Sequence, residues 1–208
     1  MTRRRDPFAM ALESLRFRTE QGAYAPGSPV VIMDEARRLG LSTTPVREAL
    51  VWLSGYGLVE RSPTGGFLAP RMDRAIVRDR YAFRLQCVLE SLAVEPQGAG
   101  LEAGADAGSA VAGLAERMLC SVRMTGNAVL VDAYRRVCSQ LTQVQAVETR
   151  LFDDVKEEAN ALLNRFGAGA AREGLVEALR HYHQRRIEAA PLLILQVEAG
   201  RGGLGDDA

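Results

Sequence analysis

The residues best suited to chemistry lie in a short polar run that begins at Ser42 and ends at Arg47. The hydroxyl groups of Ser42, Thr43 and Thr44 can cap the N-terminus of a helix, and the two threonines can equally contact a phosphate. Pro45 suits the first turn of a helix, where its missing N–H group costs little. Arg47 carries a planar guanidinium group that fits phosphates and guanine edges through paired hydrogen bonds. The run predicts a helix end that contacts nucleic acid, with a solvated Arg47 paired to a nearby acid as the alternative.

Apolar residues at helical spacing predict the helix that carries Arg47. They recur at intervals of three and four residues, which places them on one buried face. The set is Val46, Ala49, Leu50 and Leu53. Gly40 permits a tight turn before this helix, and Asp34 is predicted to cap a shorter helix that precedes the turn, with Arg37 and Arg38 on its outer side. Two helices joined in this way form a helix-turn-helix, which inserts its second helix into a DNA major groove.

A small β-hairpin is predicted directly after this helix. Residues 58–61 and 66–69 are short segments that flank a turn containing Gly65 and Gly66, as in a hairpin. The two glycines let the backbone of such a wing approach a DNA minor groove, while a plain hairpin turn is the alternative. With an amphipathic helix over residues 8–21, the N-terminal part is predicted to be a winged helix-turn-helix.

The motifs of this region resemble the GntR family of bacterial transcription regulators. The family signature has Pro-Gly before the second helix, then Ser-x-Thr-Pro-Val-Arg-Glu-Ala-Leu, Gly-Leu-Val and a glycine-containing wing. The matching segments are Pro26-Gly27, Ser42–Leu50, Gly57–Val59 and Gly65-Gly66. The resemblance implies that DNA is contacted by Ser42, Thr43, Thr44, Pro45, Arg47, Arg37, Arg38, Gly65 and Gly66. The family usually has Arg where this chain has Thr43, so the operator of its relatives does not carry over.

Composition favours an intracellular protein with two domains. The chain has 208 residues, of which 47% are hydrophobic, enough for two cores. No apolar run approaches the roughly 20 residues that cross a bilayer, and no apolar segment follows the charged N-terminus as a signal peptide would require. The three cysteines are widely spaced, which favours buried thiols over a disulfide framework or a zinc site. We therefore expect a cytoplasmic protein that does not enter a membrane.

Charge is distributed unevenly along the chain, although the net charge is zero. Residues 1–72 contain ten Arg and seven Asp or Glu, a net charge of +3, whereas residues 73–208 have a net charge of −3. Of the 26 basic residues, 25 are Arg. The modest positive excess favours DNA binding by a homodimer, because a dimer doubles the contacts to phosphates.

The second part of the chain is predicted to be an antiparallel helical bundle, because its apolar residues recur every three or four positions. On the long helix predicted over residues 73–95 they are Leu85, Val88, Leu89 and Leu92. Pro191 is predicted to separate the last two helices, and the Gly-rich acidic tail is predicted to be disordered. The fold class is therefore mainly α. It comprises a winged helix-turn-helix domain with a β-hairpin wing over 1–72, an all-helical domain over 73–199 and a tail over 200–208.

The second part is also similar, more loosely, to the FadR branch of the GntR family. The Arg84-x5-Glu90 spacing and the run Arg135-Arg136-Val137 match that branch. The branch has a C-terminal helical FCD domain that binds an effector within the bundle and forms or supports the dimer. The resemblance implies a small organic acid effector bound by Arg84, Tyr134, Arg135, Cys138 and His183. Each of these residue types, taken alone, is also common on surfaces and in salt bridges.

A metal cofactor is not expected. Many members of the branch hold a divalent metal with one Asp and three His, but this chain contains only two His. Alignment with the branch places Tyr134 at the Asp position and Cys138 at the first His position, with His183 at the second. A Cys138–His183 pair for a soft metal is the alternative, against a core role for Cys138 and a polar lining or surface role for His183.

Transcription regulation fits these patterns better than catalysis. An enzyme needs acid, base or nucleophile groups that converge, and the sequence has neither a Gly-rich phosphate loop nor a nucleophile elbow. A winged helix can also be a protein-interaction module that has lost effector binding or specific DNA binding. We expect a non-enzymatic regulator, a homodimeric repressor that binds a short palindromic operator in double-stranded DNA and responds to a small molecule.

Overall fold

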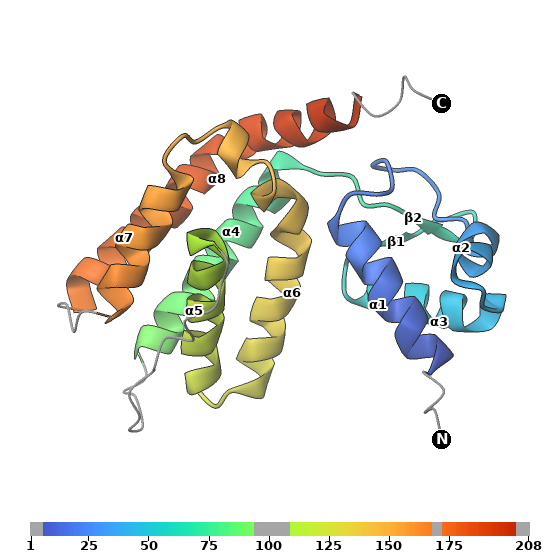
Figure 1. Cartoon of the computed structure of the whole chain (residues 1–208), viewed down its shortest axis with the longest axis horizontal. Coiled ribbons are helices and arrows are strands. Elements are labelled where there is room, and N and C mark those ends of the chain that lie inside the picture. The colour runs from blue at the N-terminus through green and yellow to red at the C-terminus, as the bar shows by residue number, and fades with distance from the viewer. Residues whose placement is uncertain (1–5, 94–108, 168–171, 203–208) are drawn as a thin grey trace. The chain divides into compact units, whose positions relative to one another are not determined.

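The computed structural model describes residues 6–93, 109–167 and 172–202. The chain divides into two compact units, Met1–Met72 and Asp73–Ala208, and Figure 1 shows the elements of each. The predicted fold class is confirmed, because the described residues are mostly helical with a small antiparallel sheet in the N-terminal unit. None of the described helices is long and apolar enough to cross a membrane.

Three described helices and a hairpin make up the N-terminal unit. The helices are α1 (Pro7–Glu20), α2 (Ile32–Leu39) and α3 (Thr43–Gly55), and the strands are β1 (Glu60–Arg61) and β2 (Phe67–Leu68). The strands are antiparallel, with Glu60 opposite Leu68 and Arg61 opposite Phe67. The segment before α2 joins this sheet, because the Val30 N–H donates to the Phe67 carbonyl at 2.8 Å. This arrangement is the predicted winged helix-turn-helix, and the hairpin is its wing.

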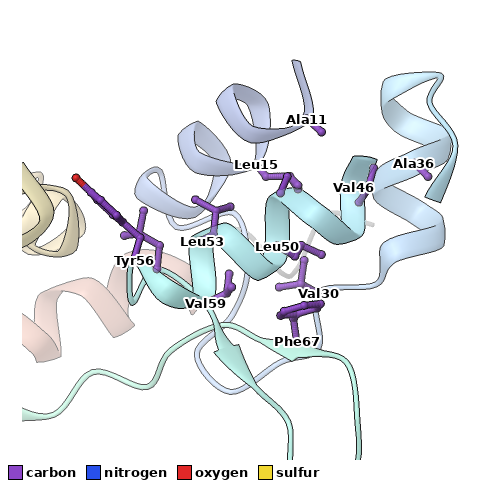
Figure 2. Packing of buried hydrophobic residues seen from close by; sticks show 12 residues of the cluster. Ala11, Leu15, Val30, Ala36, Val46, Leu50, Leu53, Tyr56, Val59 and Phe67 are labelled. Atoms are coloured by element: carbon purple, nitrogen blue, oxygen red, sulfur yellow. The ribbon is translucent and has the colours of Figure 1, made fainter. Parts of the chain in front are cut away.

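The apolar face predicted on α3 forms the centre of the N-terminal core. All four of its predicted residues are fully buried: Val46, Ala49, Leu50 and Leu53. Figure 2 shows Leu15 of α1 and Phe67 of β2 in the same cluster. Each buried Leu or Val stabilises the fold by about 1.5–3 kcal/mol. The core therefore fixes α3 against α1 and the hairpin and leaves the opposite face of α3 to solvent.

The turn between α2 and α3 has the predicted glycine conformation, whereas the start of α2 differs. Gly40 ends α2 with φ 64°, in the left-handed region, and its N–H donates to the Arg37 carbonyl at 3.2 Å. The prediction that Asp34 caps α2 is wrong, because α2 begins at Ile32 with Val31 as its N-cap residue. The earlier start lets Ile32 pack against the core. Asp34 lies inside the first turn, where its charge meets the positive end of the helix dipole.

Helices make up most of the described part of the C-terminal unit. They are α4 (Arg74–Ala93), α5 (Ala110–Met124), α6 (Ala128–Gln145), α7 (Val155–Gly167) and α8 (Arg172–Gly202), with a short 3-10 helix, η1 (Glu148–Arg150), between α6 and α7. Helix α4 packs against α5, α6 and α8, while α5 packs against α7. Helix α4 therefore contributes side chains to contacts with three neighbours, and its central position in the bundle is visible in Figure 1.

Two predictions for the last helix are wrong. Pro191 lies inside α8 and does not separate two helices, although it lacks the N–H group that would bond the Ile187 carbonyl. Pro191 is exposed while the adjacent Ala190 is fully buried, so packing of the opposite face holds the helix together. The tail predicted to be disordered from residue 200 begins as helix, because α8 continues to Gly202. Residues 203–208 lie outside the described part of the chain.

The buried face of α4 is rotated relative to the predicted one. Among the four predicted residues only Val88 is buried, while Leu85, Leu89 and Leu92 are partly exposed. The buried set is Val77, Tyr81, Arg84, Cys87, Val88 and Ser91. The prediction failed because it followed apolar side chains alone, and Arg84 lies on the buried face.

Candidate nucleic-acid interface and buried polar cluster

The N-terminal end of α3 presents hydroxyl groups to solvent. Ser42 is the N-cap residue, with an extended backbone (φ −71°, ψ 165°), and its side chain makes no capping hydrogen bond to a described residue of α3. Thr44 is exposed, while Thr43 and Pro45 are half-buried. The N–H groups of a first helical turn and the positive end of the helix dipole attract anions such as phosphate. This end of α3 can therefore hold a phosphate through both side-chain and backbone donors.

Arg47 lies on the solvent face of α3, in the second turn. Its side chain is exposed, and no acidic side chain of the described residues forms an ion pair with it. The alternative prediction, a solvated Arg47 paired with Glu48 or Glu60, is therefore not supported, because neither ion pair is present among the described residues. A guanidinium group on a rigid helix, with no ion pair to the described residues, can reach a base edge or a phosphate.

The two arginines of α2 differ in their surroundings. The Arg37 side chain is 80% exposed and pairs only loosely with Asp34, at 3.7 Å. The Arg38 guanidinium is bonded to the buried Glu35 at 2.7 Å and to Ser14 Oγ of α1 at 2.9 Å. Arg38 therefore ties α2 to α1, and Arg37 is the more available of the two for an outside partner.

The wing turns through two glycines that have positive φ. Gly65 and Gly66 have φ values of 98° and 82°, both are exposed, and the Ser62 N–H donates to the Gly66 carbonyl at 3.1 Å. Non-glycine residues rarely adopt this conformation, so the turn alone accounts for both glycines. Arg61 of β1 is exposed beside this turn. The sequence analysis did not include Arg61 among the candidate DNA contacts, because it placed this residue only in a strand. The position of a basic residue next to the predicted wing turn could have identified it.

The comparison with known families concerns this unit. Residues 9–68, from α1 to β2, match the profile of the gntR family of bacterial regulatory proteins. The N-terminal unit is a GntR-type helix-turn-helix. Two curated relatives match more than a third of the chain each. The chain is 35% identical over 85 residues to the HTH-type transcriptional regulator McbR of Escherichia coli K12, which is 39% of this chain and 38% of that protein.

The second relative is an uncharacterized HTH-type transcriptional regulator in an unstable DNA locus of Streptomyces ambofaciens. Identity is 39% over 72 residues, which are 35% of this chain and 30% of that protein. The alignments thus span 38% and 30% of the two relatives, so the chain covers well under half the length of either protein.

Solved structures extend the similarity of fold over most of the chain. Escherichia coli McbR/YncC matches 90% of this chain and 98% of its own with a TM-score of 0.63 at 19% identity. A GntR transcriptional regulator of Rhodococcus sp. RHA1 matches 88% of this chain and 96% of its own with a TM-score of 0.73 at 16% identity. At such low identity these matches establish the fold: a GntR-type winged helix followed by a helical unit.

The helical unit that follows the GntR-type winged helix contains a buried polar cluster. Arg84 of α4, Tyr134 of α6 and His183 of α8 are each no more than 1% exposed. The Arg84 Nη2 atom lies 3.6 Å from Met118 Sδ, and its Nε and Nη1 atoms have no hydrogen-bond partner among the described residues. The Tyr134 hydroxyl and His183 Nε2 also lack such a partner. Several polar atoms are therefore buried without a hydrogen bond to the described residues. Burying a polar atom in this way lowers the stability of the fold unless a partner such as a ligand is bound.

The protonation state of His183 follows from its surroundings. Its Nδ1 atom lies 2.8 Å from the Leu179 carbonyl of the same helix, so Nδ1 carries the proton and donates. Burial, with a smaller contribution from the Arg84 charge, lowers the pKa of His183 to about 3. The imidazole is therefore neutral at pH 7, and its Nε2 atom can only accept a hydrogen bond. Burial likewise raises the pKa of Tyr134 and keeps its hydroxyl protonated.

The other two predicted effector residues lie differently. Arg135 is exposed on α6 and is not part of the buried cluster. Cys138 is half-buried, and its effect on the pKa of Tyr134, which burial mainly raises, places its thiol near the cluster. Among the described residues, no group of three or more His, Cys, Asp and Glu side chains is arranged to hold a metal ion.

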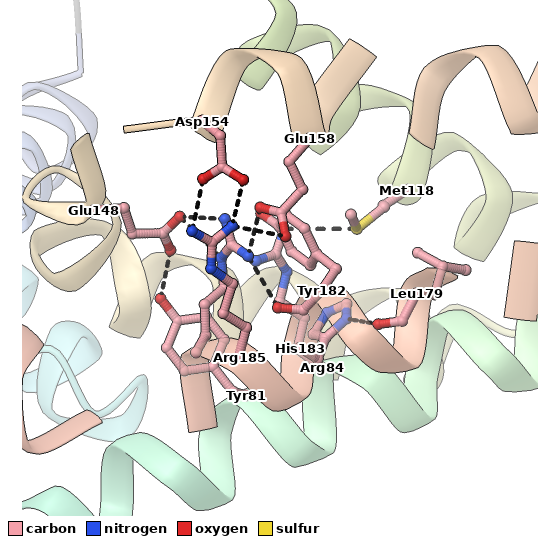
Figure 3. A network of polar contacts seen from close by, with 11 residues as sticks. Tyr81, Arg84, Met118, Glu148, Asp154, Glu158, Leu179, Tyr182, His183 and Arg185 are labelled. Carbon is pink, nitrogen blue, oxygen red and sulfur yellow. Dashed lines mark hydrogen bonds and ion pairs between the residues drawn. The ribbon is translucent and has the colours of Figure 1, made fainter. Parts of the chain in front are cut away.

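A second buried cluster, which sequence reasoning missed, lies beside the first (Figure 3). The fully buried Arg186 of α8 pairs with Glu148 of η1 at 2.8 Å and with Glu158 of α7 at 2.9 Å. The Tyr81 hydroxyl donates to the other oxygen of Glu148 at 2.7 Å, and the Arg186 guanidinium lies 3.4 Å from the centre of the Tyr182 ring. This cluster ties α4, η1, α7 and α8 together. The sequence held no signal for its ion pairs, because Glu148 and Glu158 lie far from Arg186 in the chain.

Proposed function

We propose that the chain is a cytoplasmic transcription regulator that binds a short palindromic operator as a homodimer. The observation that carries the proposal is Arg47, exposed and without an ion-pair partner in the described residues, on the reading helix of a GntR-type helix-turn-helix. Phosphate contacts from the α3 end and from Arg37 position the helix, and Arg47 contacts bases. Thr43 stands where relatives usually have Arg, so helix α3 should prefer a different operator sequence from theirs.

The test is a fluorescence anisotropy titration of the full chain with DNA from upstream of its own coding sequence, at two salt concentrations. Arg47→Ala is expected to weaken specific binding by about 1–3 kcal/mol, or roughly 5- to 150-fold, if Arg47 contacts a base. Arg180→Ala, which removes an exposed arginine of α8, is the matched control and should bind like the wild type. Binding without sequence preference, or no binding, would refute the proposal and favour a protein-interaction module.

We also propose that a small organic acid regulates this DNA binding, and the buried polar cluster of the helical unit supports this part of the proposal. A carboxylate would supply acceptors for the free Nε and Nη1 atoms of Arg84 and for the Tyr134 hydroxyl, each of which lacks a partner in the described chain. Paired hydrogen bonds between guanidinium and carboxylate groups are among the strongest in proteins. His183 Nε2 accepts, so it favours an acid that also carries a hydroxyl group.

A bound acid regulates only if it binds two arrangements of the protein with different affinity. We propose that the acid favours an arrangement with lower DNA affinity, as in a repressor that is released by its ligand. A thermal-shift screen of carboxylic acids and hydroxy acids, with divalent metals as a separate arm, followed by anisotropy in the presence of any acid that binds, tests this part. A binding acid that leaves DNA affinity unchanged would contradict it.

A further inference from the structure

An apolar side chain lies among polar ones on the solvent side of α3. Residues three, four and seven positions apart share one side of a helix. On α3 the side opposite the buried Leu53 therefore carries four exposed residues, which together form the reading face: Thr44, Arg47, Glu48 and Val51. Val51 lies one turn after Arg47 and Glu48, near the middle of the reading face, and is 42% exposed.

The fold of the N-terminal unit does not use the Val51 side chain. Val51 belongs neither to the buried core of this unit nor to the partly buried side chains packed against that core. A β-branched residue also favours a helix less than Ala or Lys does. A single exposed valine elsewhere on a surface needs no explanation, but at the middle of the face that carries Arg47 it is placed to contact what Arg47 contacts.

The neighbours of Val51 leave room for a close approach, which its short side chain requires. Gly55 follows on the reading face one turn later. It is exposed, and a Cβ atom there would meet nothing within 4 Å, so the fold itself does not require a glycine. The ring of Trp52, the next residue along the chain, stacks on Tyr56 with the ring centroids 4.8 Å apart. The end of the reading face beyond Val51 is therefore low, and α3 can approach the floor of a groove there.

The chemistry of the major groove identifies the partner of Val51. Base edges in that groove present hydrogen-bond donors and acceptors, and the apolar group among them is the C5-methyl of thymine. Contact with this methyl removes apolar surface of both partners from water. We infer that Val51 contacts the methyl group of a thymine in each half-site and makes the regulator select thymine there. The inference rests on the proposed function, because it names a base that the same helix reads.

The spacing of Val51 and Arg47 limits where this thymine lies. The two residues are four positions apart, which is about 6 Å along a helix that rises 1.5 Å per residue. Successive base pairs of B-DNA are about 3.4 Å apart. The thymine should therefore lie within about two base-pair steps of the base pair that Arg47 contacts, which is the pair where Arg47→Ala loses its sequence preference.

The test uses duplex DNA that the full chain enriches from a random library, and it measures binding by fluorescence anisotropy. Each thymine of the enriched half-site is replaced in turn, in both half-sites, by deoxyuridine, which lacks the methyl group and keeps the base pairing. Val51→Ala is the variant. Val31→Ala is the matched control, because Val31 is 45% exposed at the N-cap position of α2, outside the reading face. Circular dichroism checks that both variants remain helical.

The wild type should bind about fourfold more weakly per half-site when the contacted thymine is replaced, as expected for one apolar carbon returned to water. Val31→Ala should show the same loss, whereas Val51→Ala should bind the thymine and deoxyuridine duplexes equally. Wild-type binding that no deoxyuridine weakens, or an enriched half-site without thymine in the stated interval, would overturn the inference. So would methyl dependence that Val51→Ala retains in full, or that Val31→Ala loses equally.

The enrichment step separates this inference from the proposed function. A chain that enriches no sequence would refute the proposed regulator and this inference with it. A chain that enriches an operator but shows no dependence on a thymine methyl group would refute this inference alone and leave the regulator standing.

Discussion

His183 should make the helical unit lose stability below about pH 6.5, the usual pKa of histidine. The imidazole is fully buried, and burial lowers its pKa in the folded chain to about 3. The unfolded chain therefore binds a proton between pH 6.5 and 3 that the folded chain does not. The free energy of unfolding rises with pH wherever the unfolded state holds more protons. The contribution of His183 is thus fully present above pH 6.5 and falls as the pH is lowered toward 3.

The size of this effect follows from the same two pKa values. Each pH unit of separation between them corresponds to about 1.4 kcal/mol. Between pH 7 and pH 5 the wild type should lose about 2 kcal/mol through His183, because most of the interval below pH 6.5 contributes at the full slope. That is a large share of the roughly 5–15 kcal/mol by which most domains are stable.

The assay compares His183→Asn with His181→Asn by urea unfolding at pH 7, 6 and 5. Asparagine keeps a donor near the position of Nδ1, so the bond to the Leu179 carbonyl can survive, but it does not titrate. His181 is the exposed neighbour on the same helix and serves as the control. Circular dichroism follows the helices of both units. Fluorescence of Trp52, the single tryptophan, follows the winged helix alone.

The expected result is a difference between wild type and His183→Asn that shrinks by about 2 kcal/mol from pH 7 to pH 5. The control should keep the wild-type slope, and the Trp52 transition should not respond to the His183 substitution. A pH-independent difference between wild type and His183→Asn would refute the reasoning, since it would mean that His183 is protonated in the folded chain or reaches water there.

The remaining predictions concern the two buried arginines of the helical unit. Glu148→Gln should lower the free energy of unfolding by about 3 kcal/mol at pH 7, because it removes one charge partner of the buried Arg186; a loss below about 1 kcal/mol in urea unfolding would contradict this. Arg84→Met should raise the thermal midpoint of the ligand-free chain, because it replaces an unpaired buried charge, and should abolish stabilisation by any acid that binds the wild type. A thermal-shift series with wild type and variant checks both effects.

The parts of the fold that the sequence predicted correctly depend on local patterns. The buried face of α3 follows from the spacing of its apolar residues, and Gly40 adopts the positive φ that its position in the turn required. The hairpin follows from two short segments around a turn. Each of these features is set by residues within a few positions of one another, so one sequence is sufficient to infer them.

The parts that the sequence did not predict depend on partners distant in the chain. Arg37 and Arg38 are adjacent and chemically identical, yet only Arg38 is bonded to Ser14, which lies 24 residues away on α1. Pro191 is tolerated within α8 because the opposite face of the helix is buried. A rule based on proline alone does not include that packing energy. It therefore predicted that the helix ends at Pro191, whereas the helix continues.

Arg84 and Arg186 show the same limit at the candidate effector site. Both are fully buried in the helical unit, although residue type alone does not distinguish either from a surface arginine and only the resemblance to the FadR branch drew attention to Arg84. Arg186 has two carboxylate partners, Glu148 and Glu158, so its charge is compensated within the fold. Arg84 forms an ion pair with none of the described carboxylates, and its Nη2 atom lies 3.6 Å from the Met118 thioether. A buried cation without an anion lowers stability by several kcal/mol, and an acid from solution would remove that cost, which is the physical basis for proposing that an effector acid binds Arg84.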